Sequence, residues 1–554
     1  MQIALRTNLD ITIFMKIPIF RTPLFIYICN SIFLLITASF FWDKIPMSES
    51  VYFLEESQSL SKALHNFWHP PFYIILLSLF NLITDVDFSG GYWLGYLSVI
   101  ASGGLILKIV EVKKPGIFSQ PENMILLLLG YFSLPAIFQG IFLFDVDNTV
   151  LTPILLGSYL AYLRFKDSPN LRGALFLGVI LSFGLWSKMT TPLLLMGTIG
   201  LYHLFSRDYQ FLFKKLVPLF TFTVILFWLT YGFLYTHYLL DGYGSFQFSG
   251  GKAWGLLTGQ NTFQLPLKQL VFSLGSNVGA IFVWSSLWLP IPFILVLILG
   301  WKKKRFNFSL LFIIVLFVSY SILLKIQVSA GFPKYHYPAY SFLYILFGLS
   351  FTETSWKFSW TDSLVLICVL CFTIFFTNDV IYSFYSFGRE HLYKDLVISL
   401  AQYLCVTSIP VIFLYVWNRK NISGINDLIK LMIIAIIIFN IGGLYFRIKA
   451  DYSTNYHYGI SKTEQVLKYA NSIPEKETVY FPYAGIFMQG AYNSENPSYG
   501  RIANHSFFKP ETDYIIMSDP MIKSGNYFFK IDYLHMNYTR IKTIGSYGVW
   551  KHNE

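Results

Sequence analysis

The stretch LIKLMIIAIIIFNIGGLYF, residues 428–446, decides the fold class of this 554-residue chain. Lys430 is its only charged residue. A helix needs about 20 consecutive apolar residues to cross the hydrocarbon core of a bilayer, so the stretch is predicted to span a membrane. Similar runs recur along the chain, and the other predicted spans cover 23–41, 91–110, 123–140, 149–163, 173–187, 192–205, 216–238, 271–299, 306–327, 339–351, 361–380 and 396–417.

The composition agrees with a chain built mostly of such spans. Hydrophobic residues make up 55% of it and charged residues 13%, and the mean hydropathy is +0.52. Soluble domains carry roughly 25% charged residues, so the composition excludes a soluble globular enzyme and a disordered chain. The recurrence of the runs excludes a single-span anchor. The 4 cysteines all lie in apolar segments, which leaves no disulfide framework and no zinc spacing.

The formal net charge of +11 comes from short clusters of lysine and arginine between the apolar runs. Clusters of this kind mark the cytoplasmic loops of membrane proteins, so no nucleic-acid partner is expected. About 20 of the 41 cations fall in alternate loops, at Arg6, Lys16, Arg21, Lys108, Lys113, Lys114, Arg164, Lys166, Arg172, Arg207, Lys214, Lys215, Lys302, Lys303, Lys304, Arg305, Lys357, Arg419, Lys420 and Lys430. This bias places the N-terminus in the cytoplasm.

The apolar segment 72–83 tests this topology, because its 12 residues are fewer than a span needs. If the segment crossed the membrane, Lys113 and Lys114 would lie outside. If it is interfacial or re-entrant, every later cluster of cations stays inside. We therefore predict an interfacial or re-entrant segment and about thirteen spans. An odd number of spans places residues 450–554 on the outer face.

Residues 450–554 are more polar than the rest of the chain, and their charges nearly cancel. SKTEQVLKYANSI (461–473) has a serine N-cap and helical spacing. Three segments are typical of strands, namely TVYFPY (478–483), DYIIMS (513–518) and TRIKTIGSYGVWKH (539–552). The predicted fold class is an all-α polytopic membrane protein with a small C-terminal α+β extracytoplasmic domain. The predicted domains are residues 1–449, whose outer loop 42–90 carries interfacial helices, and residues 450–554.

Three places on the predicted outer face gather ionisable residues next to span ends. Charged groups are costly near a bilayer, so each place is a functional candidate. The first is the loop 42–71, where Glu49 lies close to a span and His69 precedes two prolines that fix its direction. The alternative is a solvated loop with ordinary surface acids, which we prefer for Glu55 and Glu56.

The second place is FQGIFLFDVDNTV (138–150), where Asp145 and Asp147 lie at the outer mouth of two spans. The two acids are candidates for proton transfer. The alternative is that they, or Asn148, cap a helix that starts at Thr149.

The third place is GFPKYHYPAY (331–340), which brings Lys334, Tyr335, His336 and Tyr337 to the end of a span. Lys188, in LWSKMTTP, is in a similar position. Snorkelling lysines and interfacial tyrosines are the alternative explanation for these residues.

Taken in chain order, these motifs resemble a known family. Their order consists of an outer-loop acid, HPP before an apolar helix, a second acidic outer loop, a lysine in SKMT, and PKYHYP at the start of a late span. This order of motifs is similar to that of the GT-C superfamily of membrane glycosyltransferases. The similarity is to its family-39-like branch, which includes protein O-mannosyltransferases and the bacterial aminoarabinose transferase of lipid A. The resemblance covers about residues 40–350 and implies the GT-C fold. HPP is the most specific of these motifs, and the resemblance rests on the order of the whole set.

The resemblance also implies a catalytic base in the first outer loop. The family carries an Asp-Glu pair there, and the matching pair in this chain is Ser48-Glu49, so serine stands where aspartate is usual. Three alternatives stay open. Glu49 is the base, or Asp145 or Asp147 supplies the carboxylate, or the chain has lost activity.

The same resemblance implies residues that bind the donor phosphate. His69 matches the family's polar residue before Pro-Pro, and Lys334-Tyr335 matches its basic-Tyr pair ahead of a late proline, here Pro338. The chemistry agrees, because a sugar that departs from a polyprenyl phosphate leaves a phosphate anion that nearby cations stabilise. Lys188 is expected at the right depth for this task. The acceptor must lose a proton as it attacks, which calls for a carboxylate.

The sequence therefore predicts an integral-membrane glycosyltransferase of the bacterial inner membrane. It would move a sugar from a polyprenyl-phosphate donor to an extracytoplasmic acceptor (lipid A, a surface glycan or a protein) with inversion. A divalent cation on Asp145, Asp147 and Glu49 stays open, and no other cofactor is expected. The alternatives are a transporter, for which Lys325 is the intramembrane charge to watch, a flippase or ligase of lipid-linked glycans, and an inactive GT-C-like protein.

Overall fold

The structure is a computed structural model. It describes residues 22–40, 53, 56–57, 59–61, 71–84, 88–232, 271, 274–275, 277–279, 281–282, 285–302, 307–323, 333–352, 360–377, 393–419, 422, 424–449, 466, 469–470, 472–474, 477–480, 512–518, 531–544 and 547–553. Among the predicted functional residues, Glu49 and His69 lie outside this part of the chain, as does Lys325.

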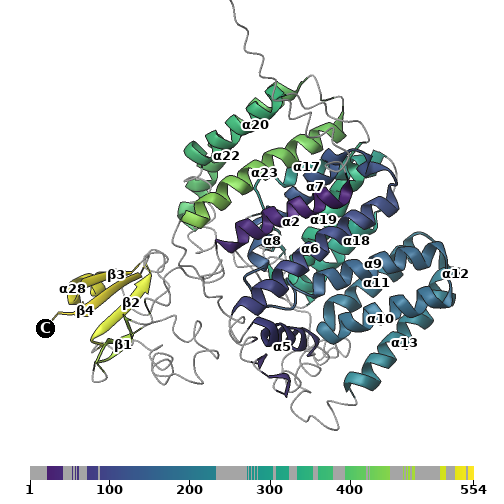
Figure 1. Ribbon diagram of the computed structural model, residues 1–554, viewed down its shortest axis with the longest axis horizontal. Coiled ribbons are helices and arrows are strands. Elements are labelled where there is room, and N and C mark those ends of the chain that lie inside the picture. The colour runs from purple at the N-terminus through teal and green to yellow at the C-terminus, as the bar shows by residue number, and fades with distance from the viewer. Residues whose placement is uncertain are drawn as a thin grey trace, which may run out of the picture.

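The described part of residues 1–449 is helical and forms a bundle (Figure 1). Its α-helices are α2 (Pro23–Ser39), α5 (Phe72–Thr84), α6 (Phe88–Lys113), α7 (Pro121–Phe132), α8 (Pro135–Gly140), α9 (Leu151–Asp167), α10 (Leu171–Ser187), α11 (Thr190–Phe205), α12 (Tyr209–Phe211), α13 (Val217–Phe227), α17 (Pro290–Lys302), α18 (Phe308–Phe317), α19 (Tyr337–Ser350), α20 (Trp360–Phe372), α22 (Tyr393–Asn418) and α23 (Ile425–Lys449). The 3-10 turns η2 (Ile117–Ser119) and η7 (Lys334–His336) precede α7 and α19. The π-helical turns η3 (Leu212–Leu216), η4 (Trp228–Gly232), η6 (Val318–Leu323) and η8 (Thr373–Thr377) adjoin α13, α18 and α20.

Several of these helices match membrane-span length and composition. Four in the described part are long and apolar enough to cross a bilayer, namely Ser89–Lys113, Tyr209–Tyr231, Leu400–Asn418 and Ile425–Leu444. Others, such as α10 and α11, are apolar but shorter. The last of the four covers residues 428–444 of the apolar stretch 428–446, and 89% of its most apolar window is buried inside the bundle. The predicted fold class, a helical membrane protein with a small C-terminal α+β part, is confirmed.

The predicted single span 123–140 is wrong, because the chain forms two helices there. α7 ends at Phe132, and α8 begins at Pro135. Leu134 has φ −59° and ψ 128°, a backbone conformation outside the helical region. Proline disfavours a helical conformation in the residue before it and has no N–H to continue the helix. Pro135 therefore breaks the span and leads the chain into the loop that carries Asp145.

The short helix α5 occupies the segment predicted to be interfacial or re-entrant. Its 13 residues extend about 20 Å, less than the hydrocarbon core of about 30 Å. Tyr73 and Leu77 are buried on one face, where α5 packs on α6, while Leu82 and Ile83 are exposed. Its length agrees with the prediction, and its place relative to the bilayer stays a prediction.

The helix α19 forms the centre of the bundle. Every residue of it except Leu349 is buried, and it contacts α6, α7, α9, α17 and α18. Against this core, α6 approaches the loop 141–150 so closely that only glycine fits. A Cβ added at Gly95 would lie 2.5 Å from the carbonyl oxygen of Ile141. The loop is therefore held directly against the backbone of α6.

The C-terminal part contains a sheet of four strands in the described residues. The strands are β1 (Val479–Tyr480), β2 (Tyr514–Ser518), β3 (Tyr538–Ile544) and β4 (Tyr547–His552), and α28 (Ile531–Asn537) precedes β3. Their order is β1-β2-β4-β3, with β1 parallel to β2 and the other pairs antiparallel. All three predicted strand segments contain strands, and the third, 539–552, forms two strands paired as β3 and β4. Most of the predicted helix 461–473 lies outside the described residues.

Candidate functional site

The loop between α8 and α9 carries two buried acids. Asp145 is 6% exposed and Asp147 is 1% exposed. Asn148 holds the loop closed, because its side-chain amide donates to the carbonyl oxygens of Gly140 at 2.7 Å and Leu143 at 2.6 Å. The backbone N–H of Asp147 donates to Oδ1 of Asp145 at 3.0 Å. Both carboxylates are thus fixed in a tight turn.

These acids do not cap the following helix. The N-cap of α9 is Val150, and no side chain accepts a hydrogen bond there. The backbone carbonyl of Asp147 instead accepts a hydrogen bond from the Thr152 hydroxyl at 3.0 Å. The capping alternative is therefore not what the loop shows, and the carboxylates are directed toward other elements.

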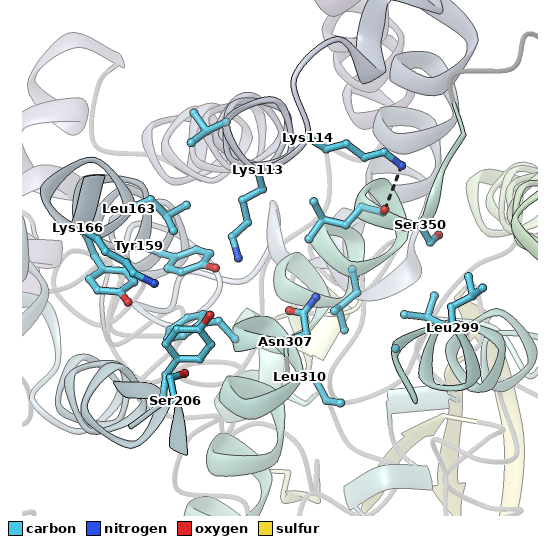
Figure 2. A pocket seen from close by; sticks show the side chains of 18 of the residues that line it. Lys113, Lys114, Tyr159, Leu163, Lys166, Ser206, Leu299, Asn307, Leu310 and Ser350 are labelled. Atoms are coloured by element: carbon cyan, nitrogen blue, oxygen red, sulfur yellow. Dashed lines mark hydrogen bonds between the residues drawn. The ribbon is translucent and has the colours of Figure 1, made fainter. Parts of the chain in front are cut away.

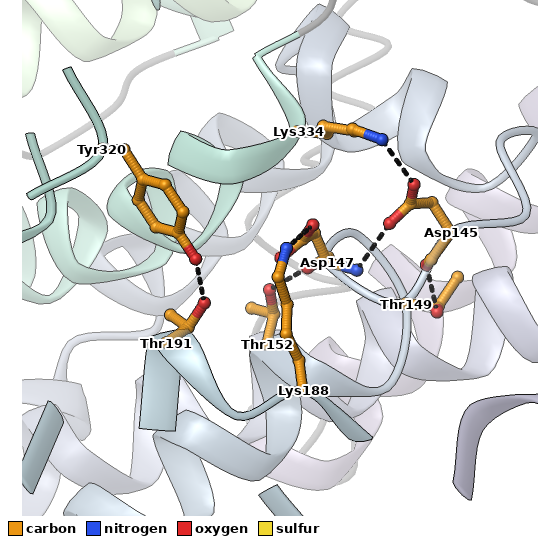
Figure 3. A network of polar contacts seen from close by, with 8 residues as sticks. All are labelled: Asp145, Asp147, Thr149, Thr152, Lys188, Thr191, Tyr320 and Lys334. Atoms are coloured by element: carbon orange, nitrogen blue, oxygen red, sulfur yellow. Dashed lines mark hydrogen bonds and ion pairs between the residues drawn. The ribbon is translucent and has the colours of Figure 1, made fainter. Parts of the chain in front are cut away.

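Lys188 occupies the break between α10 and α11. Its backbone is extended, with φ −162° and ψ 128°, which ends α10 and turns the side chain inward. The side chain is 7% exposed, and its ammonium forms a hydrogen-bonded ion pair with Oδ2 of Asp147 (Figure 3). Buried charges are tolerated in proteins when they are paired in this way.

The turn η7 brings the next two predicted residues to the same place. Nζ of Lys334 lies 3.3 Å from Oδ2 of Asp145. The ring of Tyr335 lies beside both lysines, with its centroid 4.4 Å from Nζ of Lys188 and 5.0 Å from Nζ of Lys334. Such distances are typical of cation–π contacts. The snorkelling and interfacial alternatives do not describe these contacts, since each lysine faces an acid and the aromatic ring.

The structure therefore brings together five residues that the sequence placed in separate loops. Two acids pair with two lysines, both lysines lie beside one tyrosine ring, and the formal charges cancel. We call these residues, Asp145, Asp147, Lys188, Lys334 and Tyr335, the charge cluster. Their catalytic and phosphate-binding roles stay predictions.

Burial and pairing shift the protonation of the buried pair in the charge cluster. Burial raises the pKa of Asp147 to about 6, although the nearby ammonium of Lys188 acts to lower it. Burial acts to lower the pKa of Lys188, but the carboxylate of Asp147 outweighs this effect and raises it above its ordinary value. At neutral pH both members of the pair are therefore charged. An aspartate with a pKa closer to neutrality is a better proton acceptor than an ordinary one.

Sequence reasoning missed two residues beside the charge cluster. The hydroxyl groups of Tyr320 and Thr191 are hydrogen-bonded at 2.7 Å. The Tyr320 ring centroid lies 5.8 Å from Nζ of Lys188 and 5.3 Å from the ring of Tyr335. Tyr320 is one tyrosine in a predicted span, and nothing in its local sequence marks it. Thr191 belongs to the LWSKMTTP segment, in which Lys188 is the one charged residue and the threonines carry no comparable signal.

His336 is also buried next to this group. Its ring centroid lies 4.6 Å from that of Phe317 in a tilted contact and 5.9 Å from that of Tyr320 in an edge-to-face contact. Among the described residues, neither ring nitrogen of His336 has a hydrogen-bond partner. Burial lowers its pKa to about 3, so this imidazole is neutral. It supports the turn that presents Lys334 and Tyr335.

The open question of a divalent cation is tested by the same geometry. The described residues include no group of three or more His, Cys, Asp or Glu side chains placed to hold a metal ion. Asp145 and Asp147 each face an ammonium group at ion-pair distance. These two carboxylates do not fit a cation site, because a divalent ion would lie against the lysines. Glu49, the third proposed ligand, lies outside the described residues, as does Ser48.

Comparison with protein families finds one match. The family model described as dolichyl-phosphate-mannose-protein mannosyltransferase matches residues 68–234. That segment contains Asp145, Asp147 and Lys188. No curated protein sequence matches the chain at a significant level.

Comparison with solved structures finds the same overall architecture. The crystal structure of ArnT from Cupriavidus metallidurans in the apo state superposes with a TM-score of 0.50 at 12% identity, covering 95% of this chain and 96% of that one. The structure of the same protein bound to undecaprenyl phosphate gives a TM-score of 0.47 at 12% identity, covering 94% and 97%. At this identity the likeness shows the fold. Together, the family match and the fold confirm the predicted resemblance to the GT-C superfamily and support a membrane glycosyltransferase.

Proposed function

Starting from this resemblance to GT-C glycosyltransferases, we propose that the chain transfers a sugar from a polyprenyl-phosphate donor to an extracytoplasmic acceptor, with inversion at the anomeric carbon. The observation that carries the proposal is the charge cluster, in which the buried Asp147–Lys188 pair lies beside the Asp145–Lys334 pair. The description of the matched family names a dolichyl-phosphate sugar, which belongs to the same chemical class of donor.

The two lysines supply the charge that the leaving group needs. As the bond between the anomeric carbon and the phosphate oxygen breaks, the phosphate keeps the electron pair and gains negative charge. Lys188 and Lys334 both lie beside the Tyr335 ring, and fixed cations at this position stabilise the developing anion. Tyr335 holds both ammonium groups near one ring and sets the distance between them. His69 is proposed to contact the same phosphate.

Asp147 is the carboxylate that we propose as the base. Lys188 holds only its Oδ2, and the buried Oδ1 has no hydrogen-bond partner in the described part of the chain. The acceptor hydroxyl or amine attacks the anomeric carbon from the face opposite to the phosphate and transfers its proton to Asp147. One carbon–heteroatom bond forms as one breaks, so a single displacement inverts the configuration. Asp145 positions Lys334, and Glu49 is retained as an alternative base.

The proposed orientation in the membrane follows from the charge bias of the loops. We place the protein in a bacterial inner membrane, with its N-terminus in the cytoplasm and residues 450–554 outside. The acceptor classes are lipid A, a surface glycan and a protein. We propose that the C-terminal domain covers the acceptor entrance. Deleting residues 455–554 should change acceptor use more than donor binding, and an unchanged acceptor profile would argue against this role.

The experiment that tests the proposal begins with the acceptor. Mass spectrometry of envelope lipids, glycans and proteins from cells with and without the gene identifies the species that gains a sugar. Appearance of that species is then measured in cells that carry Asp147→Asn. Loss of a general base typically costs 10²–10⁴-fold in rate, so we expect the product to fall below about 1% of the wild-type level.

A matched control separates this loss from a general effect of removing an acid. Asp208 also pairs with a basic side chain, His203, at 2.9 Å, but it lies at the turn after α11 and is 42% exposed. Asp208→Asn should keep the wild-type amount of product. If cells with Asp147→Asn formed the wild-type amount of product at an equal protein level, the assignment of Asp147 as the base would be wrong.

A further inference from the structure

A second polar site lies at the opposite end of the bundle from the charge cluster. A cavity of about 1370 Å³ is lined there by residues of α6, α9, α11, α17, α18 and α19, among them Lys113, Tyr159 and Lys166. The helix α9 starts at Leu151, just after the loop of the charge cluster, and ends at Asp167, which lines the cavity. Its 17 residues extend about 25 Å. The cavity is therefore separate from the proposed active site.

Two lysines point into this cavity without an acidic partner. Figure 2 shows the ammonium groups of Lys113 and Lys166 directed toward one space beside Tyr159. Nζ of Lys113 lies 5.6 Å from the centroid of the Tyr159 ring, and Nζ of Lys166 lies 5.2 Å from that of Tyr202. Within the described residues, neither lysine forms an ion pair. This differs from the charge cluster, where each lysine faces a carboxylate.

The third lysine of the cavity has a structural role. Lys114 donates hydrogen bonds to the backbone carbonyl oxygens of Leu349 and Phe351, which tie the end of α6 to the end of α19. It contributes positive charge to the cavity wall, but its donors are engaged. The lining thus holds three lysines against one acid, Asp167. A negatively charged ligand would balance this excess.

Tyr159 supplies a hydrogen-bond donor at the same point. Its side chain is fully buried, and its hydroxyl makes no hydrogen bond of standard geometry among the described residues, with the hydroxyl of Ser309 nearby. The neighbouring Tyr162 hydroxyl is already bonded to Nε2 of His203 at 2.8 Å. A buried hydroxyl without a partner carries a free-energy cost, and an anionic oxygen between the two lysines would accept its hydrogen bond.

The remaining wall of the cavity is apolar. It is lined by aliphatic side chains from α9, α17, α18 and α19, namely Leu163, Val296, Leu299, Leu310 and Leu346. A site with cations on one side and aliphatic side chains on the other fits a ligand with an anionic head and a hydrocarbon chain. A small inorganic anion would leave the apolar wall unused.

We propose that this cavity binds the phosphate group of an anionic membrane lipid between Lys113 and Lys166, with the hydroxyl of Tyr159 as a donor and the lipid chain along the leucine wall. Charge-assisted hydrogen bonds from lysine to phosphate are among the stronger polar contacts in proteins. With the orientation proposed above, the bound lipid belongs to the cytoplasmic leaflet. This lipid site lies at the end of the bundle opposite to the charge cluster, and its occupancy does not depend on the proposed reaction.

The test uses the purified full-length protein in a neutral detergent and native mass spectrometry. Dioleoyl phosphatidic acid is titrated as the probe, dioleoylglycerol serves as the same lipid without phosphate, and inorganic phosphate serves as the head group without chains. Each lost charge-assisted contact is worth about tenfold in affinity. We expect Lys113→Ala/Lys166→Ala to weaken phosphatidic acid binding by tenfold or more, and Tyr159→Phe to weaken it several-fold.

Two further variants keep the test independent of folding. Lys113→Arg/Lys166→Arg preserves the charge and should retain binding. Lys108→Ala removes an exposed lysine of the same helix that does not line the cavity, and it should bind phosphatidic acid as the wild type does. Equal binding of phosphatidic acid by the wild type and the double alanine variant would overturn the proposal. So would equally tight binding of dioleoylglycerol, or binding of inorganic phosphate without binding of the lipid.

Discussion

The pH dependence of sugar transfer tests the role of Asp147 directly. Burial raises the pKa of this carboxyl group to about 6, whereas an ordinary aspartate has a pKa of about 3.9. Only the ionised carboxylate accepts a proton from the acceptor. Transfer should therefore be fast above pH 6 and should be lost as the pH falls through about 6. If the base had an ordinary pKa, the transfer rate would not change between pH 8 and pH 5.

The size of the effect follows from the same value. With a pKa of about 6, about 90% of Asp147 is ionised at pH 7 and about 10% at pH 5. The rate should fall roughly tenfold between these two pH values. The contribution of Asp147 to the free energy of unfolding changes with pH in the direction opposite to the rate. A carboxyl group whose pKa is raised by folding adds stability below its unfolded pKa and loses that contribution as the pH rises through about 6. A lower rate at pH 5 therefore cannot come from unfolding driven by this group.

The assay is single-turnover transfer by purified protein between pH 4.5 and pH 8.5. Lys334 is one of the charges that lower the pKa of Asp147, so Lys334→Met should move the acidic limb of the profile to higher pH as well as slow the reaction. Asp208→Asn, at the other end of the bundle, should leave the limb in place. A limb that stays fixed in Lys334→Met, or a flat wild-type profile, refutes the argument for Asp147.

Two further predictions concern the support of this site. Lys188→Met leaves the carboxylate of Asp147 buried without its partner, which typically costs about 3–5 kcal/mol. Thermal unfolding in detergent should show a large loss of stability, which the double variant Asp147→Asn/Lys188→Met largely restores. Additive losses of stability in the double variant would contradict the pairing. Gly95→Ala places a Cβ 2.5 Å from the carbonyl oxygen of Ile141, so it should destabilise the protein by about 1–3 kcal/mol and slow transfer, whereas Gly197→Ala, which meets nothing within 4 Å, should leave both unchanged.

The sequence predicted helices best where apolar length alone decides them. The helix α10, Leu171–Ser187, agrees with the predicted span 173–187 to within two residues at its start and ends where predicted. Length cannot show where a helix breaks inside an apolar run. Pro135 splits the span predicted at 123–140 into α7 and α8. Hydropathy does not register the missing N–H of this proline, which interrupts the helix.

The candidate site was accessible to sequence analysis for a different reason. A charged residue is so costly near a bilayer that Asp147, Lys188 and Lys334 stand out in any apolar sequence. Tyr320 contributes to the same place but carries no charge, and one tyrosine among the 38 of the chain gives no signal. Lys166 shows the opposite error. The sequence marks it only as a topology signal, because its approach to the cavity at the end of α9 depends on packing that the sequence does not display.

The neutrality of the charge cluster has a consequence for how the proposed reaction would begin. A phosphate donor brings negative charge, and at Lys188 and Lys334 it meets cations that already face Asp147 and Asp145. The anion and the carboxylates compete for the same ammonium groups, and two anions cannot share them without repulsion. Donor binding at this site would therefore loosen the hold of Lys188 on Asp147 and raise the affinity of that carboxylate for a proton. The proposed base would become stronger only when the leaving group is in place, which would tie proton transfer to the bound donor.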